Sequence, residues 1–229
     1  MTLAMLRAAA QQPDGSRWLG ALLQGLRQGE RLGLTWPAVN LVDQHLDVSW
    51  QLQALNYRHG CERNGGRWAC GRRFGGDCPQ RRLRVPDGYA YRQLGGALCL
   101  VRPKTERLIP LVPWMTAALE SWRAVAPPSP HQLVWPRADG RPQTAREDAD
   151  AWRALQEAAG IAGRGRPYYG HEARHTTATL LLEAGTDPKV VQAILGHNSV
   201  ATSRSYQHVS PDMARRAVDA VVQRLQVVP

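Results

Sequence analysis

Apolar residues recur at helical spacing through much of the chain. Residues 3–11 predict a short helix that ends at the turn sequence PDG. Residues 16–34 predict a longer helix with Ser16 as its N-cap. Two more helices are predicted over 113–125 and 145–160, joined by a proline-rich connection. The apolar side chains along one face of the 16–34 helix are Trp18, Leu22, Leu23 and Leu26.

The last third of the chain is predicted to be almost entirely helical. A helix over 174–184 is followed by one that begins at Pro188 and ends at Gly196, because proline favours the first turn of a helix and glycine its C-terminal end. A short helix then reaches Tyr206, and a final helix covers about 210–226. The apolar residues at helical spacing in this final helix are Met213, Ala217, Val218, Val221 and Leu225.

One stretch between these helices has the pattern of β-strands. The sequence GGALCLVRPKTERLIPL predicts a hairpin with strands over 97–102 and 107–111, joined by a tight turn at 103–106. The predicted fold class is therefore α+β, mainly helical with one small antiparallel sheet.

The composition points to a polyanionic partner. The 229 residues carry a formal net charge of +10, and an excess of this size favours nucleic acid. Only two basic residues are lysines, Lys104 and Lys189. No apolar run approaches the roughly 18 residues that span a bilayer, and no signal peptide is visible. A cytoplasmic location without membrane contact is therefore expected.

The positive charge is concentrated in residues 56–85. This stretch holds eight arginines against Glu62 and Asp77, so it carries +6. It is also rich in glycine, and we interpret it as an inserted loop or small module. We expect it to contact DNA or a neighbouring copy of the chain.

Three of the four cysteines lie in this insert. They are Cys61, Cys70 and Cys78, and His59 stands two residues before the first. Three thiolates and an imidazole suit a tetrahedral zinc ion. The spacing contains no C-x-x-C pair, so zinc, free thiols and a disulfide all stay open. Cys99 lies in an apolar strand and is predicted to be a core residue.

A second set of polar residues is spread along the chain. Arginine binds two phosphate oxygens at once, and histidine donates to a third oxygen or moves a proton. Tyrosine acts as a nucleophile when positive neighbours stabilise its phenolate. A turn lysine, in a chain that otherwise uses arginine, suggests a proton donor. The set comprises Arg27, Lys104, His171, Arg174, His197 and Tyr206.

The wording and order of these motifs resemble the tyrosine recombinase (phage integrase) family. HEARH has the family's H-x-x-R-H pattern, LGH follows it, and a tyrosine stands nine residues after the second histidine motif. GLRQGERLGLTW resembles the family's first-arginine motif, and PKTERLIPL its lysine hairpin. The resemblance implies one catalytic domain over 1–229, with a small three-stranded antiparallel sheet. Glu172 stands where the family more usually has aspartate.

The resemblance assigns three residues to the scissile phosphate. Arg27 and Arg174 would clamp its nonbridging oxygens, and His197 would donate a hydrogen bond to it. Glu30, three residues after the first arginine, would orient a group of the site. Fixed cations aimed at these oxygens stabilise the charge that develops in the transition state.

The resemblance assigns the bond-making and proton transfers to three others. Tyr206 would attack the phosphorus and hold the DNA as a 3′-phosphotyrosine. His171 would take or share the tyrosine proton, and Lys104 would protonate the leaving 5′ oxygen. The covalent link stores the bond energy, so neither ATP nor a metal cofactor is implied. His175 is expected to support the site rather than to react.

The expected function is site-specific recombination, of the phage or mobile-element integrase type, at duplex DNA attachment sites in a bacterial host cell. The 210–226 helix is expected to dock on a neighbouring protomer in a tetrameric synapse. The core-binding domain that normally precedes the catalytic domain in the family is not visible in the sequence. The alternatives are a tyrosine-type transposase, a dimer resolvase and a non-catalytic DNA-binding remnant.

Overall fold

The chain forms two compact units in a computed structural model that describes residues 2–161, 168–196 and 210–225. Unit 1 comprises 1–51 and 103–229, and unit 2 comprises Leu52–Arg102. Unit 2 contains the arginine- and cysteine-rich stretch that the sequence predicted as an insert at 56–85.

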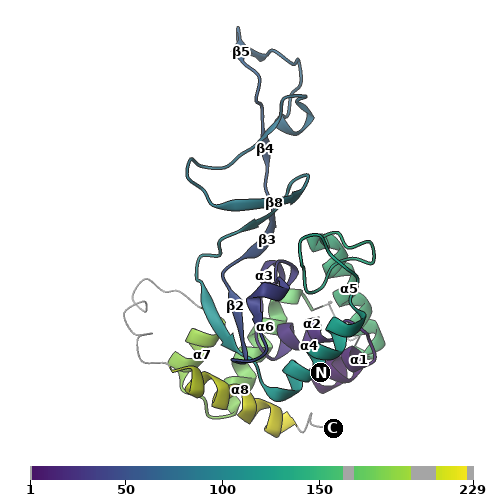
Figure 1. The fold of residues 1–229 in the computed structure, drawn as a ribbon, viewed down its shortest axis with the longest axis vertical. Coiled ribbons are helices and arrows are strands. Elements are labelled where there is room, and N and C mark those ends of the chain that lie inside the picture. Colours follow the sequence, from purple (N-terminus) through teal and green to yellow (C-terminus); the bar gives the residue numbers. More distant parts are fainter. Residues whose placement is uncertain (1, 162–167, 197–209, 226–229) are drawn as a thin grey trace. The chain divides into compact units, whose positions relative to one another are not determined.

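Unit 1 is mainly helical, as predicted, and its helices enclose one apolar core (Figure 1). Trp18, Met115 and Trp135 are fully buried there. The Trp135 indole N–H is satisfied by Ser16 Oγ at 2.9 Å. The helices of the described residues are α1 (Thr2–Ala10), α2 (Ser16–Leu22), α3 (Gln28–Leu32), α4 (Pro113–Val125), α5 (Ala145–Ala158), α6 (Gly170–Glu183), α7 (Pro188–Leu195) and α8 (Pro211–Leu225).

The single helix predicted over 16–34 is wrong, because the helix is interrupted between α2 and α3. Gly25 lies in the left-handed region with φ 63°, and Arg27 is extended with ψ 155°. A Cβ at Gly25 would also lie 2.3 Å from Leu195 Cδ2. The apolar periodicity continues across the break, so only a glycine that tolerates positive φ marks it in the sequence.

Unit 1 contains the predicted three-stranded antiparallel sheet. Its strands are β1 (Val39–Asn40), β2 (His45–Val48) and β10 (Arg107–Pro110), in the order β1-β2-β10. Ile109 of β10 stands opposite Leu46 of β2, and both side chains are fully buried. The sheet therefore presents one apolar face to the helical core.

The predicted hairpin of 97–102 with 107–111 is wrong. The first strand exists as β9 (Leu98–Val101), but it pairs with β8 (Tyr91–Gly95) and β3 (Gln51–Ala54). The second strand, β10, pairs with β2 instead. Pro103 stands two residues after the last residue of β9 and has no N–H to donate, which is consistent with the end of pairing there.

The helix that carries His171 and Arg174 begins four residues earlier than predicted. α6 starts at Gly170, and the Glu172 carboxylate accepts the backbone N–H of Tyr169 at 2.6 Å. An acidic group in the first turn satisfies a donor that the helix leaves unpaired and interacts well with the helix dipole. Both site residues therefore lie inside the first two turns of α6.

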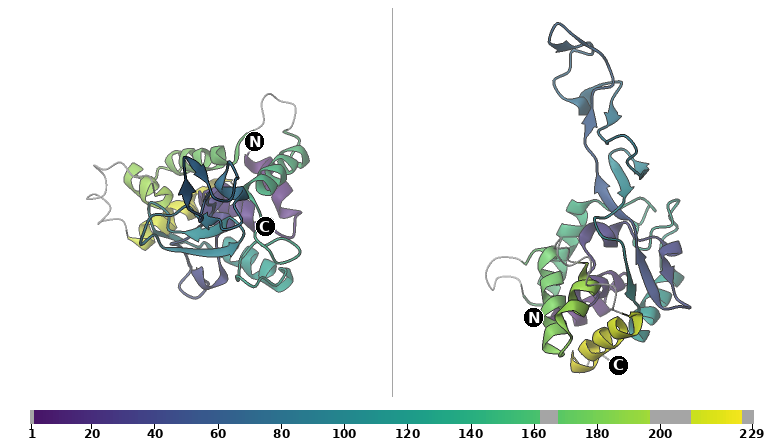
Figure 2. Two further views of the ribbon diagram at one scale, coloured as in Figure 1. Left: turned by 90° about the horizontal axis from the view of Figure 1, so that it is seen from above. Right: turned by 90° about the vertical axis from the view of Figure 1, so that its left-hand side faces the viewer.

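Helices α7 and α8 begin and end close to the predicted positions. Asp187 caps α7 by accepting the Lys189 N–H at 2.7 Å, and Gly196 ends α7 with φ 62°. α7 and α8 lie side by side in both views of Figure 2. The predicted short helix that reaches Tyr206 lies outside the described residues. None of the helices in the described ranges is long and apolar enough to traverse a bilayer.

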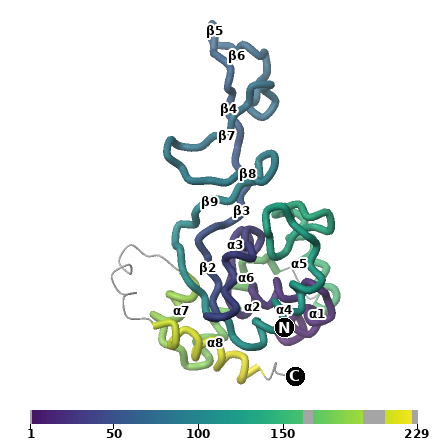
Figure 3. The backbone as a smooth tube through the Cα atoms, in the orientation of Figure 1, coloured from purple at the N-terminus to yellow at the C-terminus, as the bar shows by residue number. Residues whose placement is uncertain are grey.

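Unit 2 consists of short strands and loops. β3, β9 and β8 form its three-stranded sheet, beside which Leu55, Cys99 and Val101 make a small apolar cluster. The buried Cys99 confirms the predicted core position. Figure 3 follows the backbone from this sheet through the two two-stranded pairs. These pairs are β4 (Tyr57–Arg58) with β7 (Arg82–Leu83), and β5 (Arg63–Asn64) with β6 (Arg67–Trp68).

Candidate functional site

Three contacts hold the break between α2 and α3 in place. Gln24 Nε2 donates to the Pro110 carbonyl at 3.0 Å, and Thr177 Oγ1 donates to the Leu22 carbonyl at 2.9 Å. Arg174 Nη1 donates to the Gly25 carbonyl at 2.6 Å. All three contacts are buried, so α6 and β10 fix the backbone just before Arg27.

Arg27 occupies the N-cap position of α3 as a result of this break. Its backbone N–H donates to Glu30 Oε2 at 2.8 Å, and its Nη1 donates to Glu30 Oε1 at 2.7 Å. Its Nη2 donates to the Gly196 carbonyl at 3.0 Å. The Arg27 side chain remains 34% exposed while that of Glu30 is fully buried, so Arg27 is the accessible member of the pair.

Arg107 of β10 is a second partner of Glu30, and the sequence reasoning missed it. Its Nη1 and Nη2 donate to the two carboxylate oxygens at 2.8 and 2.9 Å, and its Nε donates to the Ile194 carbonyl at 2.9 Å. A signal existed, because strand alternation puts Arg107 on the same face as the buried Ile109. A buried arginine on that face needs an acidic partner.

The two arginines determine the charge state of Glu30. Burial alone would raise the pKa of this carboxyl, but hydrogen bonds and charges from Arg107 and Arg27 lower its pKa to about 2. Glu30 is therefore ionised at neutral pH, and both of its oxygens are used within the protein.

Gly196 brings the end of α7 against these arginines. Its φ of 62° favours glycine, and a Cβ there would lie 2.9 Å from Arg107 Cδ. Its carbonyl accepts from Arg27, and the preceding turn of α7 accepts from Arg107. The glycine of the LGH motif therefore lies at the site itself.

Arg174 adds a third guanidinium to this group. Its side chain is buried, and burial together with the charges of Arg27 and Arg107 lowers its pKa to about 9. Arg174 stays protonated at neutral pH, since arginine does not lose its proton in proteins. Three guanidiniums beside the single carboxylate of Glu30 carry a net charge of +2. An anion would relieve this repulsion.

His171 lies on the exposed side of α6, one turn before the edge-on ring of His175, whose centroid is 4.9 Å away. Partial burial and the charges of His175, Arg174 and Arg27 lower the pKa of His171. A histidine with a lowered pKa is neutral at physiological pH and can accept a proton.

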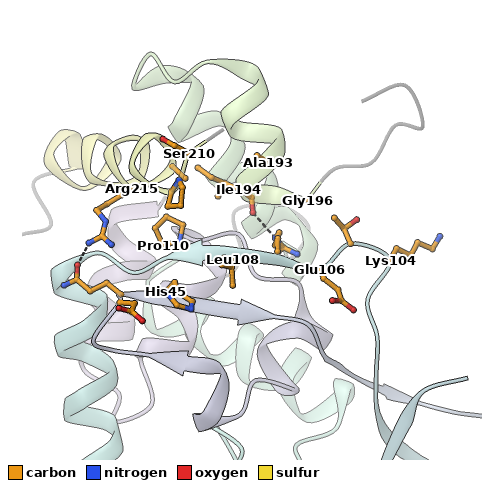
Figure 4. A pocket seen from close by; sticks show the side chains of 16 residues that line it. His45, Lys104, Glu106, Leu108, Pro110, Ala193, Ile194, Gly196, Ser210 and Arg215 are labelled. Atoms are coloured by element: carbon orange, nitrogen blue, oxygen red, sulfur yellow. Dashed lines mark hydrogen bonds between the residues drawn. The ribbon is translucent and has the colours of Figure 1, made fainter. Parts of the chain in front are cut away.

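Lys104 is exposed in the segment that leads into β10. It lines a groove of about 750 Å³ whose walls come from β2, β10 and the facing ends of α7 and α8 (Figure 4). His45, Glu106, Ile194 and Arg215 line the same groove. In Figure 4 the Lys104 ammonium points away from the groove.

The predicted site residues thus divide into three groups, one of which is Lys104 alone at the groove. Arg27, Arg174 and His171 come together through α3, α6 and their mutual charges. His197 and Tyr206 lie outside the described residues. Three further residues complete the arginine group. Glu30 was predicted from the sequence, whereas Arg107 and Gly25 were not.

A separate cluster lies in unit 2. His59, Cys61, Cys70 and Cys78 place one ligand atom each within 4.8 Å of one another. All of these cysteines are free, and Cys78 is 1% exposed. Burial would raise the pKa of Cys78, but backbone N–H groups of Gly60 and Gln80 and contacts with His59 and Cys61 lower its pKa to about 6.

Comparisons with known proteins identify relatives of the same family that the motifs resemble. The sequence profile of the phage integrase family matches residues 95–213. An integrase of Saccharopolyspora erythraea is 29% identical over 94% of the chain, and the match covers 54% of the integrase. Tyrosine recombinase XerD of Halalkalibacterium halodurans is 32% identical over 53% of the chain and 42% of its own length.

Solved structures agree on the fold. The Tn1549 transposon integrase, in complex with a circular intermediate DNA, superposes with a TM-score of 0.61 at 19% identity, over 94% of this chain and 62% of that one. The chain spans about half the length of the curated relatives that it matches.

Proposed function

We propose that this chain, which belongs to the phage integrase family, cuts and rejoins duplex DNA at specific sites through a covalent bond to Tyr206. The observation that carries the proposal is the group of Arg27, Arg107 and Arg174 around the single carboxylate of Glu30. It is a rigid cationic site without enough negative charge of its own, and a DNA phosphate has the charge and the oxygen geometry that would complete it.

The arginines have different parts in this proposal. Arg27 is partly exposed and Arg174 projects from the first turns of α6, so these two would bind the nonbridging oxygens of the scissile phosphate. Arg107 uses Nε, Nη1 and Nη2 to bind Ile194 and Glu30, so it would position Arg27 rather than touch DNA. Charges fixed before the reaction need no reorganisation in the transition state.

The chemical step would then be an in-line displacement. The phenol oxygen of Tyr206 would form a bond to phosphorus as the bond from phosphorus to the 5′ oxygen breaks. His171, kept neutral by its surroundings, would take the phenol proton. Lys104 would give a proton to the leaving oxygen, and His197 would donate a hydrogen bond to the phosphate. Reversal with another 5′ hydroxyl would rejoin the strand, without a metal cofactor.

DNA and a second copy of the chain would be the partners. The XerD and integrase relatives are named for recombination, and the Tn1549 structure contains DNA. For self-association we propose helix α8, within a tetrameric synapse. Ala217, Val218 and Val221 of α8 are buried within its own unit, so docking on a neighbour would exchange these contacts rather than create them.

A nicked suicide substrate tests the function. Duplexes selected for binding from a randomised pool would supply the site, and a nick beside the cleaved bond would let the short fragment diffuse away. We expect a covalent complex on a denaturing gel that retains the label of the 5′ end, in buffer without added divalent cations. Tyr206→Phe is the matched control, because it removes one oxygen and keeps the ring.

The outcomes separate the alternatives. Specific binding without any adduct would identify a DNA-binding remnant. An adduct that persists in Tyr206→Phe would overturn the assignment of the nucleophile. For self-association, removal of 212–229 should weaken the pairing of two DNA sites more than binding to one. Equal loss of both would mean that α8 is only part of the core.

A further inference from the structure

We propose that His59, Cys61, Cys70 and Cys78 bind one zinc ion that holds the outer part of unit 2 together. The four residues lie on both sides of the β5–β6 pair and just before β7, so one ion would join segments that the sequence separates by up to 19 positions. This site is independent of the recombination chemistry proposed for unit 1.

The distances between the ligand atoms fit a tetrahedron. With Zn–S of about 2.3 Å and Zn–N of about 2.0–2.1 Å, ligand atoms lie about 3.8 Å apart for two sulfurs and about 3.5 Å apart for sulfur and nitrogen. Cys61 Sγ and Cys78 Sγ are 3.7 Å apart. His59 Nδ1 is 3.4 Å from Cys70 Sγ and 3.9 Å from Cys61 Sγ. All four ligand atoms lie within 4.8 Å of one another, close enough to share one ion.

Backbone N–H groups point toward two of the three sulfurs. The backbone N–H of Arg72 donates toward Cys70, and those of Gly60 and Gln80 donate toward Cys78. In two of these contacts the donor stands two residues after the cysteine, so the backbone turns around the sulfur. Three thiolates and Zn²⁺ sum to −1, which the eight arginines of 56–85 would balance.

The histidine is also held in position. Its ring stacks on Trp68 of β6, with centroids 4.3 Å apart and planes 9° from parallel. The stacking turns Nδ1 toward the sulfurs of Cys61 and Cys70. A fixed ring orientation of this kind is typical of a metal-binding imidazole.

This part of unit 2 needs a crosslink because it has no apolar core. The small cluster of Leu55, Cys99 and Val101, with Leu83 and Val85 beside it, comes from the two ends of the unit's sequence. Between 57 and 82, Cys78 is the one buried side chain. The two strand pairs there have two residues per strand, and isolated pairs of this size are not stable in water. Metal binding supplies the missing folding energy in such segments.

A disulfide explains the geometry less well. It would join two sulfurs at about 2.05 Å and leave the third thiol and the imidazole unused. The observed 3.7 Å between Cys61 and Cys78 and the approach of both His59 and Cys70 favour a centre shared by four ligands.

Metal analysis of the full chain tests the proposal. We expect about one zinc per chain after purification without chelators, and less than about a tenth in Cys78→Ser. Cys99→Ser is the matched control, because Cys99 is a buried cysteine of the same unit that belongs to no ligand cluster, and it should keep the zinc. His59→Cys should also keep the metal, since four thiolates bind zinc equally well, whereas His59→Ala should lose it.

Two readouts on the wild-type chain keep the test decisive if a variant fails to fold. Cobalt in place of zinc should give thiolate-to-metal charge transfer and the visible bands of a tetrahedral ion. Chelation should expose the arginines of 56–85 to trypsin, and added zinc should restore their protection. A wild-type chain that binds less than about a tenth of an equivalent of zinc, a cobalt complex without tetrahedral bands, iron in place of zinc, or Cys78→Ser with full metal would each overturn the proposal.

Discussion

Replacement of Glu30 by glutamine is the sharpest test of the charge arrangement in unit 1. Glu30→Gln keeps the size of the side chain but removes the one carboxylate that lies among the three arginines in the described part of the chain. The pKa of Glu30 falls from 4.5 to about 2 in the folded chain. Since one pKa unit corresponds to about 1.36 kcal/mol, the ionised carboxylate contributes about 3 kcal/mol to the free energy of unfolding at pH 7.

The sign of the pH dependence follows from the direction of the shift. A lowered pKa means that the stabilisation is complete above the unfolded value of 4.5 and is lost as the pH falls through about 2. The difference between wild type and Glu30→Gln should therefore be about 3 kcal/mol at pH 7 and about 2 kcal/mol at pH 3.5. At neutral pH the melting temperature should fall by about 6–12 °C.

Urea denaturation at several pH values measures this difference, and Glu120→Gln is the control because Glu120 is exposed on α4. The control should change the free energy of unfolding by less than about 0.5 kcal/mol. A Glu30→Gln chain within about 1 kcal/mol of wild type at pH 7, or a difference that stays constant down to pH 3.5, would refute the electrostatic account of the site.

Three further predictions concern the site. Arg174→Ala should lower the rate of covalent adduct formation on the suicide substrate by at least about 10²–10³-fold, with DNA binding reduced far less; an unchanged rate would remove Arg174 from the reaction. Lys104→Ala should lose cleavage of normal DNA but recover much of it with a bridging 5′-phosphorothiolate, because sulfur leaves without a proton; equal defects on both substrates would rule out an acid. Gly196→Ala should lower the free energy of unfolding by about 1–3 kcal/mol and also slow cleavage, because the residue has φ 62° and contacts Arg107; an unchanged urea midpoint would show that the contact is dispensable.

Local signals predicted the elements whose ends depend on capping. Asp187, Pro188 and Gly196 fix both ends of α7, and each acts through its own backbone or side chain, so the sequence contains all that is needed. The resemblance to the tyrosine recombinases likewise implied that Arg27 and Arg174 belong to one site. Their pKa interaction supports this, although 147 positions separate them in the sequence.

The sequence did not reveal which β-strands pair with one another. A hairpin of β9 and β10 was predicted because the two strands are close in sequence and each is rich in apolar residues. Which strands they pair with depends on β2 and β3, whose positions are set by the fold as a whole. The same limit hid Arg107, whose importance lies in a contact with Glu30 from a distant element. Burial of a charge is a property of the assembled core and is not visible in local periodicity.

The contacts of Glu30 explain why the arginine group is poised for an anion rather than neutral. Oε1 accepts from Arg27 and Arg107, and Oε2 accepts from the Arg27 backbone and Arg107. With both oxygens engaged, the carboxylate holds two guanidiniums in fixed positions, and together with Arg174 the group keeps a net charge of +2. The electrostatic repulsion among the arginines is therefore overcome when the protein folds, before any phosphate binds. A phosphate that gains negative charge on its oxygens during displacement would be stabilised more than the resting diester, and this difference is what accelerates a reaction.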